Sequence, residues 1–109
     1  MAGYFIEPAS LPGKVLAPGV ELKVAWGEHI MLSFVRLDPG GVVPAHSHPN
    51  EQGGVCLDGA MDFTIGGETR IVRSGEGWLI PGGVTHSVRA LEHGATALDI
   101  FYPHREDYK

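Results

Sequence analysis

The most informative stretch of the sequence runs from Gly40 to Gly59 and reads GGVVPAHSHPNEQGGVCLDG. It places His46 and His48 one residue apart, and Gln52 follows four positions after His48. Alternate side chains of a β-strand point to the same face, so both imidazoles are expected on one side of a strand. Imidazole is a common ligand of divalent transition metals, and this spacing is typical of a metal site.

A second stretch, from Gly75 to Val88, reads GEGWLIPGGVTHSV and carries His86 just after a Pro-Gly-Gly turn. Two such stretches, joined by a hairpin, would bring three His together. An isolated His is more often an ordinary polar residue than a ligand, and three His of the chain are interpreted in that way. These are His29, His93 and His104, of which the last lies beside a functional candidate. For the other three, regular offsets to Gly and Pro favour a metal site.

The spacing of glycine, proline and histidine in both stretches resembles the two sequence motifs of the cupin superfamily. The matching residues are Gly40, His46, His48, Gln52 and Gly59 in the first motif, and Gly75, Pro81, Gly83 and His86 in the second. The family pattern has Glu where this chain has Gln52, and a late Asn where it has Ala90. The first departure changes the set of metal ligands, whereas the second affects a turn.

Short strands joined by tight turns account for the rest of the sequence. Apolar and polar residues alternate over 20–26, which indicates a half-buried strand, and less cleanly over 29–37. Further strands are expected at 42–49, 53–58, 61–65, 68–72, 78–81, 85–91 and 95–102, with Gly66-Gly67 as a two-residue hairpin turn. Together with the resemblance, this pattern predicts an all-β fold, the cupin double-stranded β-helix or jelly-roll barrel.

The length of 109 residues suits a single cupin domain over residues 1–109. Residues 1–19 are expected to form an N-terminal arm with one or two short strands, YFI and KVL, between Pro and Gly residues. The arm begins with the apolar residues Tyr4, Phe5 and Ile6. We expect it to pair with a neighbouring subunit in a homodimer, because the sheet edges of a small barrel would otherwise be exposed.

The composition of the chain indicates which class of partner and which cellular compartment to expect. The formal net charge of -5 and the absence of a Lys/Arg cluster argue against nucleic acid and favour small-molecule partners. Cys56 is the only cysteine, so no internal disulfide forms and no oxidising compartment is required. The first residues contain no basic leader, and no segment has the apolar length of a membrane span. These features predict a cytoplasmic protein without a membrane partner.

The expected ligand set is electrically neutral. Three imidazole nitrogens and the amide oxygen of Gln52 leave the double charge of a divalent ion uncompensated, so a carboxylate substrate would be attracted. Glu51 is a rival for the fourth position, but the spacing to Gly59 favours Gln52. These donors suit zinc, nickel, manganese or iron(II), and the sequence does not select among them. The neutral amide favours Lewis-acid chemistry over redox chemistry.

The last expected strand adds polar groups to this site. Its alternation places Asp99 and Phe101 on one face, with Leu98 and Ile100 on the other. Burying an Asp is costly unless it is paired or functional, and an exposed Asp on an edge strand is the alternative. Arg105 follows six residues after Asp99. It is either a surface charge near other acidic residues or a clamp for a carboxylate at the barrel mouth.

Three runs, HSHPNEQGGVCLDGAMDFTIGGE, PGGVTHSV and DIFYPHREDY, resemble the small single-domain cupins of the pectin-degradation KdgF type, which are uronate-linearising proteins. The resemblance covers residues 40–108. It implies metal ligands at His46, His48, Gln52 and His86, and active-site residues at Asp99, Phe101 and Arg105.

The resemblance implies an enzyme that opens the ring of a sugar. The substrate would be a small carboxylated sugar, a 4,5-unsaturated monouronate from pectin or alginate, and the product a linear 5-keto-4-deoxyuronate. One divalent ion and Arg105 would bind the carboxylate and ring oxygens, Asp99 would move protons, and Phe101 would form a flat wall. Trp78 and Tyr102 are expected in the core and at the rim.

Two other functions share the same residues. A metal-dependent cupin dioxygenase has the fold and the His triad, and it would consume oxygen when substrate is added. A non-catalytic cupin that binds a sugar or metabolite would keep the metal ligands without needing Asp99 or Arg105. Turnover separates this binding protein from an enzyme.

Overall fold

Antiparallel pairing joins all eight strands that the computed structural model contains, and the model describes residues 3–109. The elements are η1 (Pro8–Ser10), β1 (Lys14–Ala17), β2 (Val20–Trp26), β3 (Met31–Leu37), β4 (Val42–His46), β5 (Glu51–Ile65), β6 (Glu68–Arg73), β7 (Gly77–Ile80), β8 (His86–Tyr102) and η2 (Glu106–Tyr108). The two η elements are single 3₁₀ turns, and no α-helix occurs among the described residues. The predicted all-β fold is confirmed.

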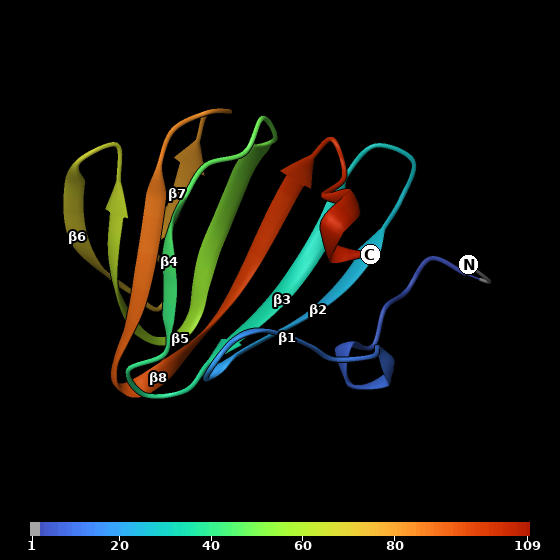
Figure 1. Ribbon diagram of the computed structural model, residues 1–109. Helices are drawn as coiled ribbons and strands as arrows, with labels where there is room; N and C mark the ends of the chain where they lie inside the picture. Colours follow the sequence, from blue (N-terminus) through green and yellow to red (C-terminus); the bar gives the residue numbers. More distant parts are fainter. Residues whose placement is uncertain (1–2) are drawn as a thin grey trace.

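The two longest strands, β5 and β8, each bend from one layer of the barrel into the other (Figure 1). The first half of β5 pairs with β7 and the second half of β8, which in turn pairs with β3. The second half of β5 pairs with β6 and the first half of β8, which pairs with β4. The resulting layers face one another and enclose an interior, as in a jelly roll.

The bends occur where β5 and β8 cross, at two register shifts in β5 between Cys56 and Asp58 and between Gly59 and Met61. Gly59 has a φ of 77°, and a Cβ there would lie 2.1 Å from the carbonyl oxygen of Gly94 on β8. Only glycine fits this approach, because its backbone adopts positive φ without steric cost and carries no side chain.

Most of the predicted strands are confirmed, and two differences have a physical reason. The strands expected at 53–58 and 61–65 are continuous in β5, and those at 85–91 and 95–102 are continuous in β8. A bulge bends a strand without ending its pairing, so the turn signals mark bends rather than strand ends. The 66–67 hairpin turn is confirmed, with positive φ at both glycines.

The arm is only partly as expected. KVL lies in β1, which pairs with β2, whereas the prediction of a strand at YFI is wrong. Tyr4 and Phe5 are 94% and 95% exposed and have no strand beside them. Positions 1 and 2 of the arm lie outside the described residues. No helix among those described is long and apolar enough to cross a membrane.

Two clusters of buried side chains fill the barrel and leave a polar zone at one end. The larger cluster lies between the layers and includes Phe63, Trp78 and Ile80. The smaller cluster contains Leu22, Met31, Phe101 and Tyr108, so the C-terminal turn η2 packs onto the end of β2 and β3 (Figure 1). This end of the barrel also carries the candidate functional residues.

Candidate metal centre

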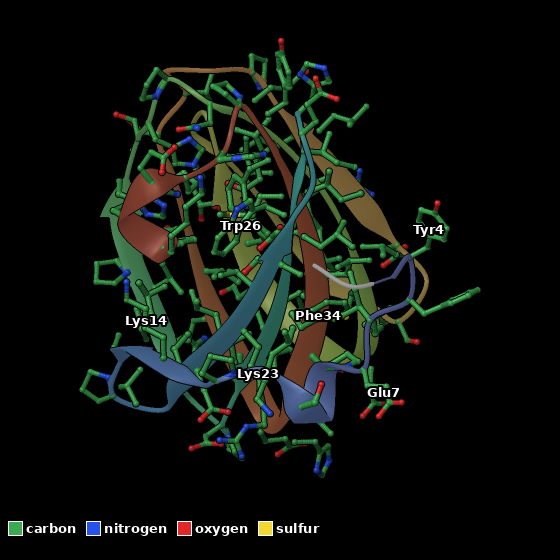
Figure 2. All side chains as sticks on the ribbon, turned by 90° about the vertical axis from the view of Figure 1, so that its right-hand side faces the viewer. Tyr4, Glu7, Lys14, Lys23, Trp26 and Phe34 are labelled. Atoms are coloured by element: carbon green, nitrogen blue, oxygen red, sulfur yellow. The ribbon has the colours of Figure 1, made fainter. Side chains whose placement is uncertain are left out.

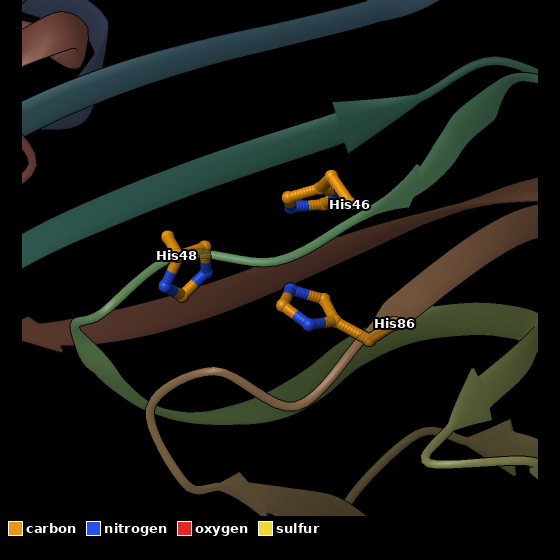
Figure 3. Close-up of side chains that lie close together, drawn as sticks. All are labelled: His46, His48 and His86. Carbon is orange, nitrogen blue, oxygen red and sulfur yellow. The ribbon is translucent and has the colours of Figure 1, made fainter.

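The side chains of three histidines lie close together (Figure 3). His46 ends β4, His48 lies in the connection to β5, and His86 begins β8. The pairing of β4 with β8 sets His46 directly opposite His86. One ligand atom from each ring lies within 4.8 Å of those from the other two, a separation that one ion can bridge. His48 and His86 are buried and His46 is half-buried. The expected cluster of three His is present.

Backbone carbonyls fix the proton position on each of these rings. Nδ1 of His46 lies 2.8 Å from the carbonyl oxygen of Pro44, and Nδ1 of His86 lies 3.0 Å from that of Val84. Nδ1 of His48 lies 3.1 Å from the carbonyl oxygen of Asn50. Since a carbonyl oxygen only accepts, each Nδ1 must donate, and each Nε2 is left with a free lone pair. This tautomer is the one that binds a metal through Nε2, with the carbonyl as outer partner.

The atoms around these lone pairs fit a bound cation. Nε2 of His48 lies 3.0 Å from Oε1 of Gln52, so in this tautomer two acceptors face each other. Nε2 of His86 is buried and has no hydrogen-bond partner among the described residues. Unpaired acceptors that face one another are unfavourable in a buried site, and a divalent ion between them would satisfy all of them. The three His and Gln52 would therefore hold the ion.

Burial also keeps two of the rings in the form that binds metal. The pKa of His48 is lowered from its ordinary value by desolvation first and by the nearby Arg105 charge second. Desolvation likewise is the largest cause that lowers the pKa of His86. Both imidazoles are thus neutral at neutral pH, and neutral imidazole is the form that coordinates a metal. Glu51, the rival fourth ligand, is exposed, whereas Gln52 is 5% exposed.

Asp99 is tied to this centre through Gln52. Its Oδ1 accepts a hydrogen bond of 3.0 Å from Nε2 of Gln52 and another of 3.0 Å from Nε1 of Trp78. The first bond orients the Gln52 amide so that its oxygen faces His48. Burial raises the pKa of Asp99 to about 6, an effect that the two hydrogen bonds partly oppose. Asp99 lies on the inner face with Phe101, as expected, and the exposed edge-strand alternative does not hold.

The close approach of Trp78 and Asp99 requires a glycine beside them. A Cβ on Gly54 would lie 2.4 Å from Nε1 of Trp78 and 2.6 Å from Oδ1 of Asp99. Trp78 belongs to the core, as predicted, but its hydrogen bond to Asp99 was not predicted from the sequence. Two glycines inside a strand, Gly53 and Gly54, were the available signal, because such residues often mark a close approach.

Arg105 lies at the mouth of the barrel and is not a surface charge. Its side chain is 10% exposed, and its Cζ lies 4.1 Å from the ring centre of Tyr108 and 5.4 Å from that of Phe101. Asp107 accepts two hydrogen bonds from the guanidinium. Phe101 is 2% exposed and its ring meets that of His48 edge-on at 5.7 Å between centroids. The structure therefore brings Arg105, Phe101 and Asp99 to the same end of the barrel as the His cluster.

Space for a ligand is divided between an inner cavity and an outer groove. The inner cavity has a volume of about 50 Å³ and a mostly apolar lining, into which Gln52, His86 and Asp99 bring polar groups. The groove has a volume of about 330 Å³ and is lined by His46, Arg105 and Tyr108, among others. Small-molecule sites usually measure a few hundred cubic ångströms. A sugar ring therefore fits the groove, and the groove adjoins the inner cavity of Asp99, because His46 and Tyr108 line both spaces.

Comparison with known proteins agrees with this architecture. The family model described as Cupin domain matches residues 33–101, more than half of the chain, and the chain belongs to this family. It is 29% identical over 110 residues to the pectin degradation protein KdgF of Dickeya dadantii (strain 3937), covering 99% of each chain.

The solved structures give the same result. KdgF from Halomonas sp. superposes with a TM-score of 0.90 at 28% identity, covering 99% of this chain and 100% of the other. A second curated relative, the H2HPP isomerase of Bacillus subtilis, is 33% identical over 94 residues, which are 83% of this chain and 39% of that protein. The resemblance to KdgF-type cupins is thus confirmed over nearly the full length.

Proposed function

We propose that the protein is a metal-dependent enzyme that opens the ring of 4,5-unsaturated monouronates to give linear 5-keto-4-deoxyuronates. The observation that carries the proposal is that a set of metal ligands, a carboxylate and a cation lie close together at one end of the barrel. A neutral set of metal ligands is hydrogen-bonded to a half-buried carboxylate, Asp99, and lies near a mostly buried cation, Arg105. The similarity to KdgF over 99% of both chains supports the choice of substrate.

Substrate binding is assigned to the groove and to Arg105. The guanidinium carries a fixed positive charge in a mostly buried position, and its planar fork matches the geometry of a carboxylate. Phe101 packs between His48 and Arg105 and gives this end of the cavity an apolar wall. A monouronate with its carboxylate on Arg105 would therefore have its ring next to His46, which also lines the groove. A bound divalent ion would supply Lewis-acid polarisation of a sugar oxygen.

Proton transfer is assigned to Asp99. Ring opening of an unsaturated uronate is an isomerisation: the C1–O5 bond breaks, the anomeric hydroxyl loses a proton, and the C4 carbon of the resulting enol gains one. No atom is added in the balance, so a single group can take the proton and return it. A carboxyl with a pKa of about 6 suits this task near neutral pH, because both of its protonation states are populated.

The experiment that tests this function is the addition of 4,5-unsaturated galacturonate to the metal-loaded protein. The near-ultraviolet absorbance of the enol ether should fall faster than in the protein-free control, and no oxygen should be consumed. Oxygen uptake in step with substrate loss would instead establish a dioxygenase. A bound but unchanged substrate would establish a binding protein.

Arg105→Ala should raise KM by about ten- to a hundredfold with a smaller change in kcat. The reason is that hydrogen bonds to a charged partner contribute about 1.5–3 kcal/mol, and this contact is made in the ground state as well as in the transition state. Steady-state kinetics measure the split. Arg36→Ala is the matched control, because Arg36 is an exposed arginine on β3. An unchanged KM in Arg105→Ala would remove Arg105 from the substrate site.

We also propose that the protein is a homodimer. Tyr4 projects away from the barrel (Figure 2), and the outer face of β5, β7 and β8 carries an apolar groove of about 560 Å³ next to Leu79, which is 83% exposed. Apolar surface of this kind usually marks an interface. The arm of a second copy is the occupant that this chain itself supplies.

Deletion of residues 1–10 should therefore weaken self-association, and so should Leu79→Glu, which places a charge in the groove. Light scattering at micromolar concentration gives the mass of each form. Exchange of Leu57, an exposed apolar residue outside this groove, for Glu is the control. A monomeric mass for the intact chain would refute the proposal.

A further inference from the structure

The C-terminal tail, residues 103–109, is fastened to the barrel at several points. Nδ2 of Asn50 donates to the carbonyl oxygens of Pro103 at 2.7 Å and His104 at 3.2 Å. Nζ of Lys14 on β1 donates to the carbonyl oxygen of Asp107 at 2.5 Å. Tyr108 is 8% exposed and belongs to the smaller core cluster. The backbone on either side of Arg105 is therefore held in place.

Within this tail, the guanidinium of Arg105 is engaged on one edge and on its flat face. Nε donates to Oδ1 of Asp107 at 3.2 Å, and Nη2 donates to Oδ2 at 3.0 Å, so the pair is bidentate. The face of the guanidinium lies over the ring of Tyr108. These contacts fix both the plane of the group and its rotation within that plane.

The opposite edge of the same group is free. Nη1 of Arg105 is buried and has no hydrogen-bond partner within residues 3–109. A buried N–H of a charged group without a partner is costly, and such an atom is normally explained by a ligand or water that completes it. Together with the second N–H of Nη2, Nη1 forms a fork that matches a carboxylate. Arg105 also lies close enough to the proposed metal ligands for its positive charge to help lower the pKa of His48 and of His86.

We propose that Asp107 is a positioning residue for the substrate site: by holding one edge of Arg105, it presents the Nη1 edge to the carboxylate of the substrate. This inference rests on the proposed function, because it takes a carboxylated sugar as the ligand. Asp107 also lines the groove, but the role proposed for it is exerted through Arg105. Its pKa is lowered, first by the hydrogen bonds from Arg105, so it stays ionised and the pair persists at neutral pH.

The physical consequence is pre-organisation. A free arginine must lose side-chain entropy when it binds a ligand, whereas one that is already held binds at a smaller cost. Loss of Asp107 should therefore weaken carboxylate binding by about three- to tenfold, the range expected for immobilising one long side chain. The opposite sign is also physically possible: an Asp that competed with the substrate for Arg105 would, once removed, make binding tighter. The sign of the effect decides between the two roles.

The test uses the methyl glycoside of 4,5-unsaturated galacturonate, whose blocked anomeric oxygen cannot open the ring, and measures its binding by calorimetry. The proteins are metal-loaded wild type, Asp107→Asn, Arg105→Ala, the double variant and Glu106→Gln. Glu106 is the matched control, because it is an acidic residue of the same tail that pairs with Lys109 instead of Arg105. Asp107→Asn should bind about three- to tenfold more weakly, and Glu106→Gln should bind like wild type.

A double-mutant cycle then shows whether Asp107 acts through Arg105. The double variant should bind no more weakly than Arg105→Ala alone, since the effect of Asp107 has already been lost. Asp107→Glu should recover part of the affinity, and the neutral methyl ester of the same glycoside should bind equally to wild type and Asp107→Asn. A merely structural role for Asp107 would weaken both ligands alike.

Four results would overturn the inference: unchanged or tighter binding in Asp107→Asn, additive effects in the double variant, equal losses for the charged and neutral ligands, or no binding of the charged glycoside by wild type. Failure of the proposed function looks different. In that case wild type binds the glycoside through Arg105 as held by Asp107, but the reactive sugar with a free anomeric hydroxyl is not opened.

Discussion

Asp99→Asn should lower turnover of the unsaturated monouronate by about a hundredfold or more, the range expected when a general acid or base is lost. The substitution is nearly isosteric, and an Asn oxygen can accept the same two hydrogen bonds from Gln52 and Trp78 that Oδ1 of Asp99 accepts. The amide orientation of Gln52 should therefore be kept, and with it the metal. What is removed is a carboxyl that can take up and release a proton.

The measurement is kcat for loss of the enol ether, together with metal content on the same sample. Asp58→Asn serves as the control, because Asp58 is an exposed carboxylate on β5, the strand that carries Gln52. Metal that is retained with lost turnover assigns proton transfer to Asp99. Wild-type kcat in Asp99→Asn would show that another group moves the proton.

His48→Ala should reduce the metal content from near one ion per chain in wild type to a small fraction of it. Losing only an outer partner of a metal ligand costs ten- to a hundredfold in affinity, so losing a ligand should cost at least that much. Nε2 of His48 also faces Oε1 of Gln52. The substitution therefore removes one proposed metal ligand and changes the surroundings of a second. His93→Ala is the control, since His93 is an exposed His beside Glu92.

A second readout of the same variant does not depend on activity. A ligand that binds only the folded state stabilises it by about 4 kcal/mol at a thousandfold excess over its Kd. Added metal should therefore raise the Tm of wild type and His93→Ala, and should leave that of His48→Ala nearly unchanged. Unaltered metal content and an unaltered metal-dependent rise in Tm would remove His48 from the ligand set.

Much of the metal centre could be predicted because its geometry is local to short motifs. His46 and His48 are separated by one residue, and the pairing of β4 with β8 then sets His86 opposite His46. The spacing to Gly59 favoured Gln52 over Glu51, and the structure buries Gln52 and exposes Glu51, since neighbouring residues of a strand point to opposite faces. The sequence does not indicate which metal is bound, and the cytoplasmic location stays a prediction.

The parts that could not be predicted depend on long-range packing. Trp78 and Asp99 lie on β7 and β8, and their hydrogen bond passes over Gly54 of the strand between them. Asn50 holds carbonyls that lie more than fifty residues further along the chain, which no local pattern reveals. The YFI segment has strand-forming residues, but β-propensity needs a partner strand and none lies beside it.

The most direct test of the account is a proton NMR time course of 4,5-unsaturated galacturonate with three samples: metal-loaded wild type, metal-stripped wild type and metal-loaded Asp99→Asn. We expect the vinyl signal of the substrate to be replaced by signals of the linear 5-keto-4-deoxyuronate in the first sample, well ahead of the spontaneous reaction. The other two samples should remain near the spontaneous rate. Equal rates in all three samples and in the protein-free control would contradict a ring-opening enzyme at this metal centre.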